Sequence, residues 1–254
     1  MCLIAWNWQP NSPTPLLVLS NRDEYYARPT RALRLWPTAP NGAKVLAGQD
    51  MQAGGTWIGV STSGRFAGIT NYRSSEKQRT DVTSRGELVS AFLQSDLNAK
   101  AYLEWLTHHV QGYNPFNLVV FDGNQLLGFE SKTALTLTLK HGIGALSNAA
   151  FDSAWPKQVQ IKDKLKSQLD LGATDAHSLV QLLHDSTLAN DDALPNTGIA
   201  HKLEQALSAT FIKTPGYGTR ACSVVHLHRT HTEFYEEMFD GSGLVGTSTY
   251  QFSR

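Results

Sequence analysis

Cys2 is the residue of this chain best suited to nucleophilic chemistry. After removal of the initiator Met1, it would carry a thiol and a free α-amine on one residue. An N-terminal amine has a pKa near ~8, so it can accept the proton of its own thiol and leave a reactive thiolate. A cysteine at position 2 is more often an ordinary small apolar residue, so the argument depends on what the fold brings beside it.

Two apolar segments place a particular residue near Cys2. The segments are Leu3 to Trp8 and Leu16 to Leu19, and residues 9–15 between them are rich in Pro, Asn, Ser and Thr, which favour turns. This pattern predicts an antiparallel hairpin. With the turn centred near residue 12, the numbers of paired residues sum to about 24, which sets Cys2 near Arg22.

The segment Asn21-Arg22-Asp23-Glu24 gives the end of the second strand an unusual density of functional groups. The guanidinium of Arg22 would favour the thiolate of Cys2, and a carboxylate of Asp23 or Glu24 could orient the α-amine. Alternation along a strand puts Arg22 and Glu24 on one face and Asp23 on the other, so the choice of carboxylate stays open. Taken in isolation, the segment also fits a strand that runs into solvent.

The elements that must hold these residues come in blocks. After the hairpin, strands are predicted at 56–60 and 65–71, and Ser84 with Glu87 fits a capping box that begins a helix. The later elements are a helix at 99–109, a strand meander at 117–121, 126–130 and 135–139, helices at 155–169, 175–184 and 202–209, and two last strands at 222–228 and 232–239. Antiparallel strands with helices inserted in blocks indicate an α+β layered fold and a single domain, residues 1–254.

A cluster of three histidines near the C-terminus raises the question of a metal site. His226, His228 and His231 offer imidazoles, which borderline-soft divalent metals favour. Structural zinc sites usually have four protein ligands, and no fourth is evident nearby. The sequence therefore favours a polar sheet face, and no metal is predicted.

Two further patterns have ordinary explanations. Gly241, Gly243 and Gly246 match G-x-G-x-x-G, but the chain ends eight residues later and leaves no room for a dinucleotide-binding unit, so no cofactor is predicted. A group of lysines lies on a predicted helix interrupted by Asp163, and it fits a solvated helix face: Lys157, Lys162, Lys164 and Lys166.

The composition excludes several classes of protein. Among 254 residues, 22 Lys plus Arg balance 22 Asp plus Glu, so no broad basic field exists for nucleic acid. Two cysteines at opposite ends of the chain do not make a disulfide framework, and free thiols fit the cytoplasm. No apolar run approaches the ~18 residues of a membrane span, and the N-terminus lacks the basic region of a secretory signal. We therefore expect a soluble, globular protein.

A series of short motifs resembles the NRDE family, also called the transport and Golgi organisation 2 family. The signature is Asn21 to Glu24 followed by Tyr25, Arg28, Pro29 and Thr30. The resemblance covers nearly the whole chain, and the order and spacing of the motifs together make it specific. The further motifs are Gly54-Gly55-Thr56-Trp57, Thr70-Asn71-Tyr72-Arg73, Ser84-Arg85-Gly86, Phe116-Asn117-Leu118, Leu146-Ser147-Asn148, Trp155-Pro156-Lys157 and Tyr217-Gly218-Thr219-Arg220.

That family is similar to the N-terminal nucleophile hydrolases, particularly the cysteine branch with choloylglycine hydrolases and penicillin V acylase. The resemblance implies a four-layer αββα sandwich. It implies Cys2 as the nucleophile, and Arg22 with Asp23 or Glu24 as the charged pair at the end of the second strand. The choloylglycine pattern is usually Arg-Asn-x-Asp, whereas this chain has Asn-Arg-Asp-Glu, so the resemblance does not choose between the two carboxylates.

The same resemblance extends to residues later in the chain. It implies Asn71 and Asn148 as oxyanion-hole or substrate-orienting amides, and Arg220 as a late active-site arginine. An Asn amide held at a strand end can donate to a developing oxyanion, and losing such a donor costs ~3 kcal/mol of transition-state stabilisation. Around position 222 the family leads one to expect Ser, and Cys222 here adds a second thiol.

Two functions follow from these residues and from the resemblance. The first is a cofactor-free cytoplasmic hydrolase in which Cys2 attacks the carbonyl of a small-molecule amide or related acyl compound. The second is a carrier or chaperone that uses the same fold without catalysis, for which the family implies haem, a lipid or acyl-coenzyme A as ligand. The fold alone does not decide between hydrolysis and binding. The oligomeric state is left open.

Overall fold

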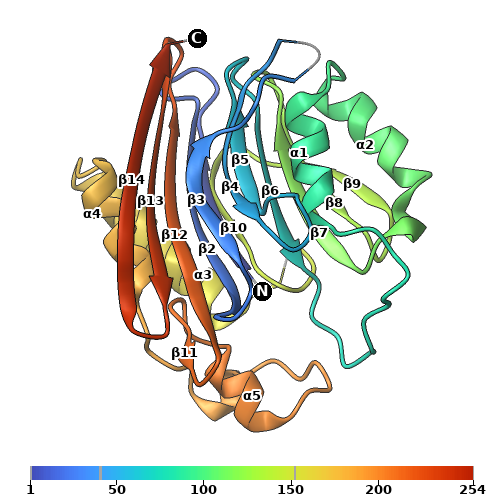
Figure 1. Cartoon of the computed structure of the whole chain (residues 1–254). Coiled ribbons are helices and arrows are strands. Elements are labelled where there is room, and N and C mark those ends of the chain that lie inside the picture. Colours follow the sequence, from blue (N-terminus) through green and yellow to red (C-terminus); the bar gives the residue numbers. More distant parts are fainter. Residues whose placement is uncertain (1, 40–41, 152, 254) are drawn as a thin grey trace.

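The strands of the protein form two sheets that pack face to face, with helices on both outer faces (Figure 1). The computed structural model describes residues 2–39, 42–151 and 153–253. Within these residues each sheet has seven strands, and neighbouring strands are antiparallel. The predicted α+β fold with four αββα layers is therefore confirmed.

The first sheet has the strand order β10-β1-β2-β12-β13-β14, with β11 beside β12. Its strands are β1 (Cys2–Trp8), β2 (Leu16–Tyr25), β10 (Gly142–Leu146), β11 (Lys213–Thr214), β12 (Tyr217–Leu227), β13 (His231–Asp240) and β14 (Gly243–Ser253). The second sheet runs from β3 to β9 in chain order. Its strands are β3 (Thr30–Leu35), β4 (Val45–Asp50), β5 (Ile58–Ser61), β6 (Phe66–Asn71), β7 (Phe116–Phe121), β8 (Leu126–Glu130) and β9 (Leu135–Thr138).

The helices divide between the two outer faces. Helices α1 (Gly86–Gln94) and α2 (Ala99–Thr107) pack on the second sheet, whereas α3 (Pro156–Asp170) and α4 (Ala176–Val180) pack on the first. The shorter helical segments are α5 (His201–Ala206) and the 3-10 turns η1 (Val110–Gly112), η2 (Gln181–His184) and η3 (Asp191–Ala193). In the described part of the chain, no helix has the length and apolar character that a membrane crossing requires.

The first hairpin has the predicted register, with Cys2 paired to Arg22. Strand β2 is longer than predicted, because it continues to Tyr25 and pairs with β12 along its other edge. The cluster from Asn21 to Glu24 therefore lies inside the sheet. Asn21, Arg22 and Asp23 are all buried, so the alternative of a strand running into solvent is wrong.

Alternate residues of β1 serve two different apolar layers. Ile4 and Trp6 face the core between the two sheets, whereas Leu3 and Ala5 face the layer of α3 and α4. A slip of one residue would move both sets into the wrong layer, and each large apolar side chain contributes ~1.5–3 kcal/mol when buried. Packing on both faces thus holds the register that sets Cys2 opposite Arg22.

Two predicted elements at the C-terminal half differ from the structure. The strands predicted to be the last two are followed by β14, an edge strand that includes Gly243 and Gly246 and pairs with β13. Its glycines and exposed polar residues concealed the alternating pattern of a strand. The helix predicted at 175–184 is divided into α4 and the 3-10 turn η2.

The predicted capping box at the start of α1 is also wrong. The N-cap residue is Arg85, and its side chain makes no capping hydrogen bond. The backbone N–H of Glu87 donates instead to the carbonyl oxygen of Ser84, at 3.1 Å. The side chain of Arg85 therefore takes no part in capping α1.

Candidate active site

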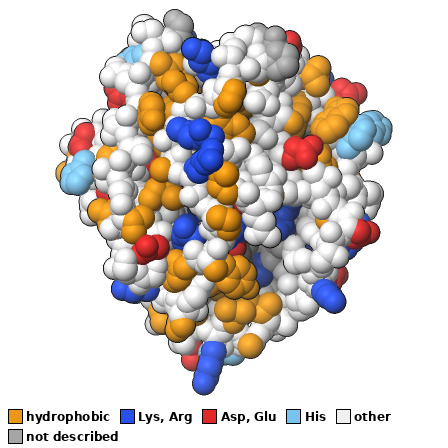
Figure 2. Space-filling view, in the orientation of Figure 1, with side chains coloured by type: hydrophobic (Ala, Val, Ile, Leu, Met, Phe, Trp, Pro, Cys, Tyr) orange, Lys and Arg blue, Asp and Glu red, His pale blue; other side chains and the backbone are white. Residues whose placement is uncertain are grey.

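Residues from both sheets and from the start of α1 meet around a small pocket of about 110 Å³ at the Cys2 end of β1. The face of the molecule in Figure 2 is hollowed in its lower half, and Lys and Arg side chains are visible inside the hollow. Five of the predicted site residues line the pocket: Cys2, Arg22, Asp23, Glu24 and Asn71. The other lining residues are Arg28, Asp50, Thr56, Trp57, Ile69, Ser84, Arg85 and Gly86.

Cys2 lies on the wall formed by the first sheet. Its side chain is almost fully buried, and Ser147 donates a hydrogen bond from Oγ to the Cys2 carbonyl oxygen at 3.4 Å. Burial raises the pKa of the Cys2 thiol, and the charge of Asp23 adds to this, whereas the charge of Arg22 lowers it. The reactivity of the thiol therefore depends on the balance of the charges around it.

Arg22 is held rigidly beside Cys2. It donates from Nη1 to Thr30 Oγ1 at 2.9 Å, and its guanidinium lies 4.3 Å above the ring of Trp57. Its Nη2 is 3.9 Å from Asp50 Oδ2, which also accepts from Arg28 Nε at 2.7 Å. These contacts come from the second sheet and from the β2–β3 turn, so the position of Arg22 depends on the packing of both layers.

The two candidate carboxylates have different surroundings. Glu24 is half-buried, and its Oε2 lies 3.8 Å from Arg28 Nε. Asp23 is 1% exposed, and its Oδ1 accepts from Thr219 Oγ1 at 2.7 Å. Burial raises the pKa of Asp23, and the charge of Lys157 is the largest influence that opposes the rise. Asp23 is thus the inner carboxylate, whereas Glu24 belongs to the group around Arg28.

Lys157 corrects the prediction of a solvated lysine face, because it is only 2% exposed. It lies four and eight residues before Ile161 and Leu165, which are fully buried, so all three share the inner face of α3. Lys166 on the same helix is solvated as predicted. The spacing of Lys157 to Ile161 and Leu165 indicated a buried position, but the grouping of Lys157 with three other lysines favoured a solvated one.

The position of α3 explains why Lys157 reaches the site. Strand β10 is antiparallel to β1 and pairs Leu146 with Ile4, so the chain leaves β10 near Cys2 and α3 begins there. Among the described residues, Lys157 Nζ has no hydrogen-bond partner. Burial lowers the pKa of Lys157 to about 8, and the charges of Asp23 and Cys2 oppose this shift.

The two predicted amides have different positions. Asn71 ends β6 and lines the pocket, and its side-chain amide has no hydrogen bond to another described residue. Asn148 is fully buried and is not among the described residues that line the pocket. Its Nδ2 donates to the Asn71 carbonyl oxygen at 2.8 Å, and its backbone carbonyl oxygen accepts from the backbone N–H of Arg73 at 2.6 Å. Asn148 therefore braces the end of β6 that presents Asn71.

Arg220 lies behind the site, outside the set of described lining residues. It sits at a bulge between Thr219 and Ala221, where β12 pairs with β2. Its guanidinium donates to four backbone carbonyl oxygens at 2.8 to 3.2 Å, those of Tyr25, Tyr26, Arg28 and Phe239. Arg220 thus fixes the turn that carries Arg28.

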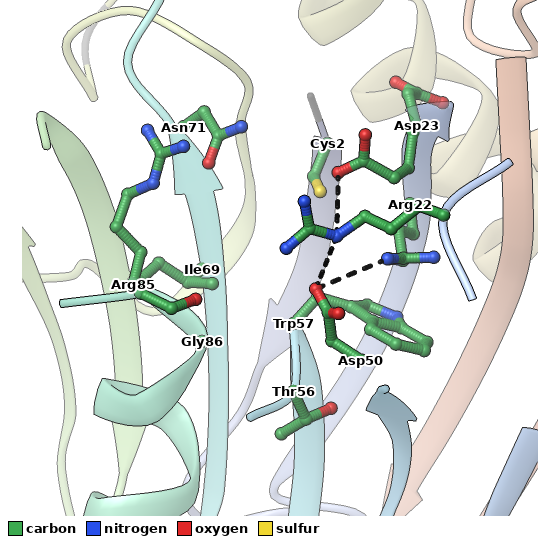
Figure 3. A pocket seen from close by; sticks show the side chains of 13 residues that line it. Cys2, Arg22, Asp23, Asp50, Thr56, Trp57, Ile69, Asn71, Arg85 and Gly86 are labelled. Carbon is green, nitrogen blue, oxygen red and sulfur yellow. Dashed lines mark hydrogen bonds and ion pairs between the residues drawn. The ribbon is translucent and has the colours of Figure 1, made fainter. Parts of the chain in front are cut away.

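The second sheet and the start of α1 supply residues that no catalytic pattern in the sequence indicated. Asp50 and Trp57 contact Arg22, and Arg85 faces Cys2 across the pocket (Figure 3). A Cβ on Gly55 would lie 2.4 Å from the backbone of Gly86, so two glycines are needed for the start of α1 to approach β5 closely. Motifs Gly54 to Trp57 and Ser84 to Gly86 were the signal, although their chemistry was not evident from sequence.

A set of possible metal ligands lies at the opposite end of the first sheet. Donor atoms of His228, His231 and Glu233 are within 4.8 Å of one another. His226, which the sequence grouped with them, uses its Nε2 in a 2.8 Å hydrogen bond with the Thr174 carbonyl oxygen. The three remaining donors are one short of a closed structural zinc site.

Solved structures share this fold at very low sequence identity. A mutant C2A conjugated bile acid hydrolase from Clostridium perfringens superposes with a TM-score of 0.52 at 9% identity, covering 99% of this chain and 97% of that one. A Caenorhabditis elegans N-acylethanolamine-hydrolyzing acid amidase ortholog gives a TM-score of 0.51 at 10% identity, covering 89% and 92%. The chain therefore has the N-terminal nucleophile hydrolase fold.

The family of the chain is defined by sequence. A sequence model of the Transport and Golgi organisation 2 family matches residues 1–241, and the chain belongs to this family. The Transport and Golgi organization protein 2 homolog of Bos taurus is 31% identical and covers 99% of each chain. The Mus musculus homolog is 30% identical and covers 100% of this chain and 99% of its own length.

Proposed function

We propose that this protein is an N-terminal cysteine hydrolase that cleaves an amide or related acyl bond of a small molecule. The carrying observation is the pairing of Cys2 with the buried Arg22, in a pocket that also receives Asn71 from the other sheet. The fold neighbours support the proposal, because one is a conjugated bile acid hydrolase and another is an ortholog of an acid amidase.

The acylation step begins once Met1 has been removed. The α-amine of Cys2 takes the thiol proton, and Sγ forms a bond to the substrate carbonyl carbon while the carbonyl π electrons move to the oxygen. The oxyanion then reforms the carbonyl, the C–N bond breaks, and the α-ammonium gives its proton to the leaving amine. The products are a thioester on Cys2 and a free amine.

Deacylation uses the same groups with water as the nucleophile. The α-amine takes a proton from water as the oxygen attacks the thioester carbonyl carbon, and collapse of the second oxyanion breaks the S–C bond. The thiolate recovers the proton from the α-ammonium, and the acyl group leaves as a carboxylic acid. No cofactor or external oxidant is needed for the balance of these steps.

Each surrounding residue stabilises a different charged group of the reaction. Arg22 stabilises the thiolate, and the Asn71 amide donates to the oxyanion, an interaction worth ~3 kcal/mol when such a donor is preorganised. Asp23 orients the α-ammonium, and Lys157 supplies a second positive charge to the same buried carboxylate. Two amines that share one carboxylate favour a neutral base, because each ammonium disfavours the other.

Substitution of the nucleophile tests the proposal. With a panel of small N-acyl amides, Cys2→Ala should lower turnover by about a thousandfold or more. Cys222→Ala is the matched control, because Cys222 is a second buried thiol away from the pocket lining, and it should keep most of the activity. Mass spectrometry of the intact protein should show loss of Met1 and an acyl adduct on Cys2. Full turnover by C2A, or Met1 retained on active protein, would contradict this mechanism.

The carrier alternative fits the pocket less well. Haem, lipids and acyl-coenzyme A are large ligands, and pockets for drug-sized molecules occupy ~300–1,000 Å³, whereas this pocket is about 110 Å³. Trp6 and Trp8 are buried in the core between the sheets, so neither is available to an apolar ligand. Stoichiometric haem or acyl-coenzyme A binding by both wild-type protein and C2A, without hydrolysis, would favour the carrier.

A further inference from the structure

The charges that line the pocket are not matched one to one. Arg22 and Arg28 both contact Asp50, and Arg28 also lies 3.8 Å from Glu24. Asp23 is bonded to Thr219, and the charge of Lys157 is its largest cationic neighbour. These groups account for the lining carboxylates, and one lining arginine is left over.

That arginine is Arg85. Its side chain donates from Nη1 to the carbonyl oxygen of Pro115 at 3.1 Å, and it has no carboxylate within 4.0 Å among the described residues. An arginine keeps its charge at neutral pH and carries five N–H donors, so most of the donors of Arg85 have no acceptor within the described part of the chain. The side chain is half-buried, where an unmatched charge is unfavourable unless a ligand compensates it.

The side chain of Arg85 lies in the pocket that holds the proposed nucleophile. Figure 3 shows its guanidinium near Asn71 on one side of the pocket, with Cys2 and Arg22 on the other. Glycines at 55 and 86 bring the start of α1 close enough to β5 for this placement. Because the pocket is small, a group bound by Arg85 is separated from the thiol by only a few bonds.

We propose that Arg85 forms an anion subsite, and that the substrate is a small N-acyl compound with a carboxylate a few bonds from the scissile amide. The planar guanidinium fork matches a carboxylate with two parallel hydrogen bonds. The substrate carbonyl then lies at Cys2 and Asn71, and the carboxylate reaches across the pocket to Arg85 at the start of α1. The position of the scissile bond rests on the function proposed above, but binding of the anion at Arg85 does not.

Binding of a matched ligand pair tests the subsite without requiring turnover. N-acetylglycine and N-acetylglycinamide have nearly the same shape and differ in one negative charge. Calorimetric titration of the C2A protein should show a preference of about tenfold for the carboxylate, the value of one charge-assisted contact. Arg85→Gln in the same background should reduce the preference to about one, and Arg85→Lys should keep part of it.

A control separates loss of the charge from loss of structure. Arg79 also donates to a backbone carbonyl, that of Gln111 at 2.9 Å, but it is exposed and lies outside the pocket lining. Arg79→Gln should therefore leave the preference unchanged, and thermal unfolding of R85Q should show that the variant is folded.

Each outcome decides one question. If the C2A protein shows no preference for N-acetylglycine, or if R85Q keeps the preference, the subsite is overturned. If the preference depends on Arg85 but the wild-type protein hydrolyses neither compound nor longer N-acyl amino acids, the anion subsite stands and the hydrolase function fails. Preferential hydrolysis of the carboxylate by wild type, lost in R85Q, supports both.

Discussion

The two ends of the first hairpin use the same strands for different purposes. At the turn end, Trp8 pairs with Leu16 and Leu16 pairs with Leu227, and all three are buried in the apolar core between the sheets. At the other end, Cys2 pairs with Arg22 and both are also buried, but the neighbours are charged.

The difference shows where stability and chemistry are located. Apolar burial stabilises the fold in proportion to area, whereas a buried charge costs free energy unless it is paired and hydrogen-bonded. Arg22 has a hydroxyl, a carboxylate and an aromatic face as partners, and Asp23 has a hydroxyl. We infer that the turn end supplies stability that the charged end requires.

The largest stability effect should come from the apolar end. Leu16→Ala removes a fully buried side chain from the core and should cost about 2 to 5 kcal/mol of unfolding free energy. Chemical denaturation measures this loss. The alkylation rate of Cys2 by iodoacetamide should stay within about twofold of wild type, because the charged end keeps its contacts.

The complementary substitution removes the nucleophile at the charged end. Cys2→Ala removes the thiol and, by the proposed mechanism, turnover, but it should change stability by only about 1 kcal/mol because the side chain is small. If L16A reduced thiol reactivity as strongly as stability, or if C2A unfolded the protein, the two ends would be one coupled unit and the comparison would fail.

Glu236 lies between the two ends and should make stability depend on pH. It is fully buried on β13, accepts the Leu33 N–H at 2.9 Å and accepts from Ser223 Oγ at 3.2 Å. Burial raises its pKa from 4.5 to about 7. The folded state therefore favours the protonated acid, and this contribution is present below pH 4.5 and lost as the pH rises through 7.

Substitution by the neutral isostere isolates this effect. Glu236→Gln should unfold with nearly the same free energy as wild type at pH 5 and should be more stable at pH 8, by up to about 3 kcal/mol. Denaturation curves of both proteins between pH 5 and 8 measure the difference. A constant difference across that range would mean that Glu236 does not titrate there.

The hairpin could be predicted because its information is local. Two apolar runs and a turn of known length set the register of Cys2 and Arg22, and packing on both faces of β1 leaves no alternative. The family resemblance indicated the fold and most of the lining residues. Strand β14 could not be predicted, because it is exposed, Gly-containing and held mainly by its pairing with β13.

The second wall of the site could not be derived from spacing. Asp50, Trp57 and Arg85 reach the pocket only through the packing of one sheet on the other, and no sequence period records that contact. Lys157 was assigned to a solvated face because a lysine is usually solvated, although its spacing to Ile161 and Leu165 indicated the inner face of α3.

Lys157 provides the smallest and most specific prediction about the charged end. A positive charge near a thiol stabilises the thiolate, so Lys157→Met should slow the alkylation of Cys2 at pH 7 by about tenfold. Lys166→Met is the matched control, because Lys166 lies on the same helix and is 68% exposed, and it should leave the rate unchanged. The measurement uses a Cys222→Ala background, so that one thiol reports.

The direction of the pH profile also identifies the group that acts. The pKa of Lys157 is lowered to about 8, so its charge is present at pH 7 and decreases as the pH rises through 8. The difference between wild type and K157M should therefore be largest below pH 8 and should shrink above it. A difference that grew with pH, or a rate at pH 7 equal to that of K166M, would show that the charge of Lys157 does not act on the thiol. The charged end would then act on the thiol through Arg22 alone.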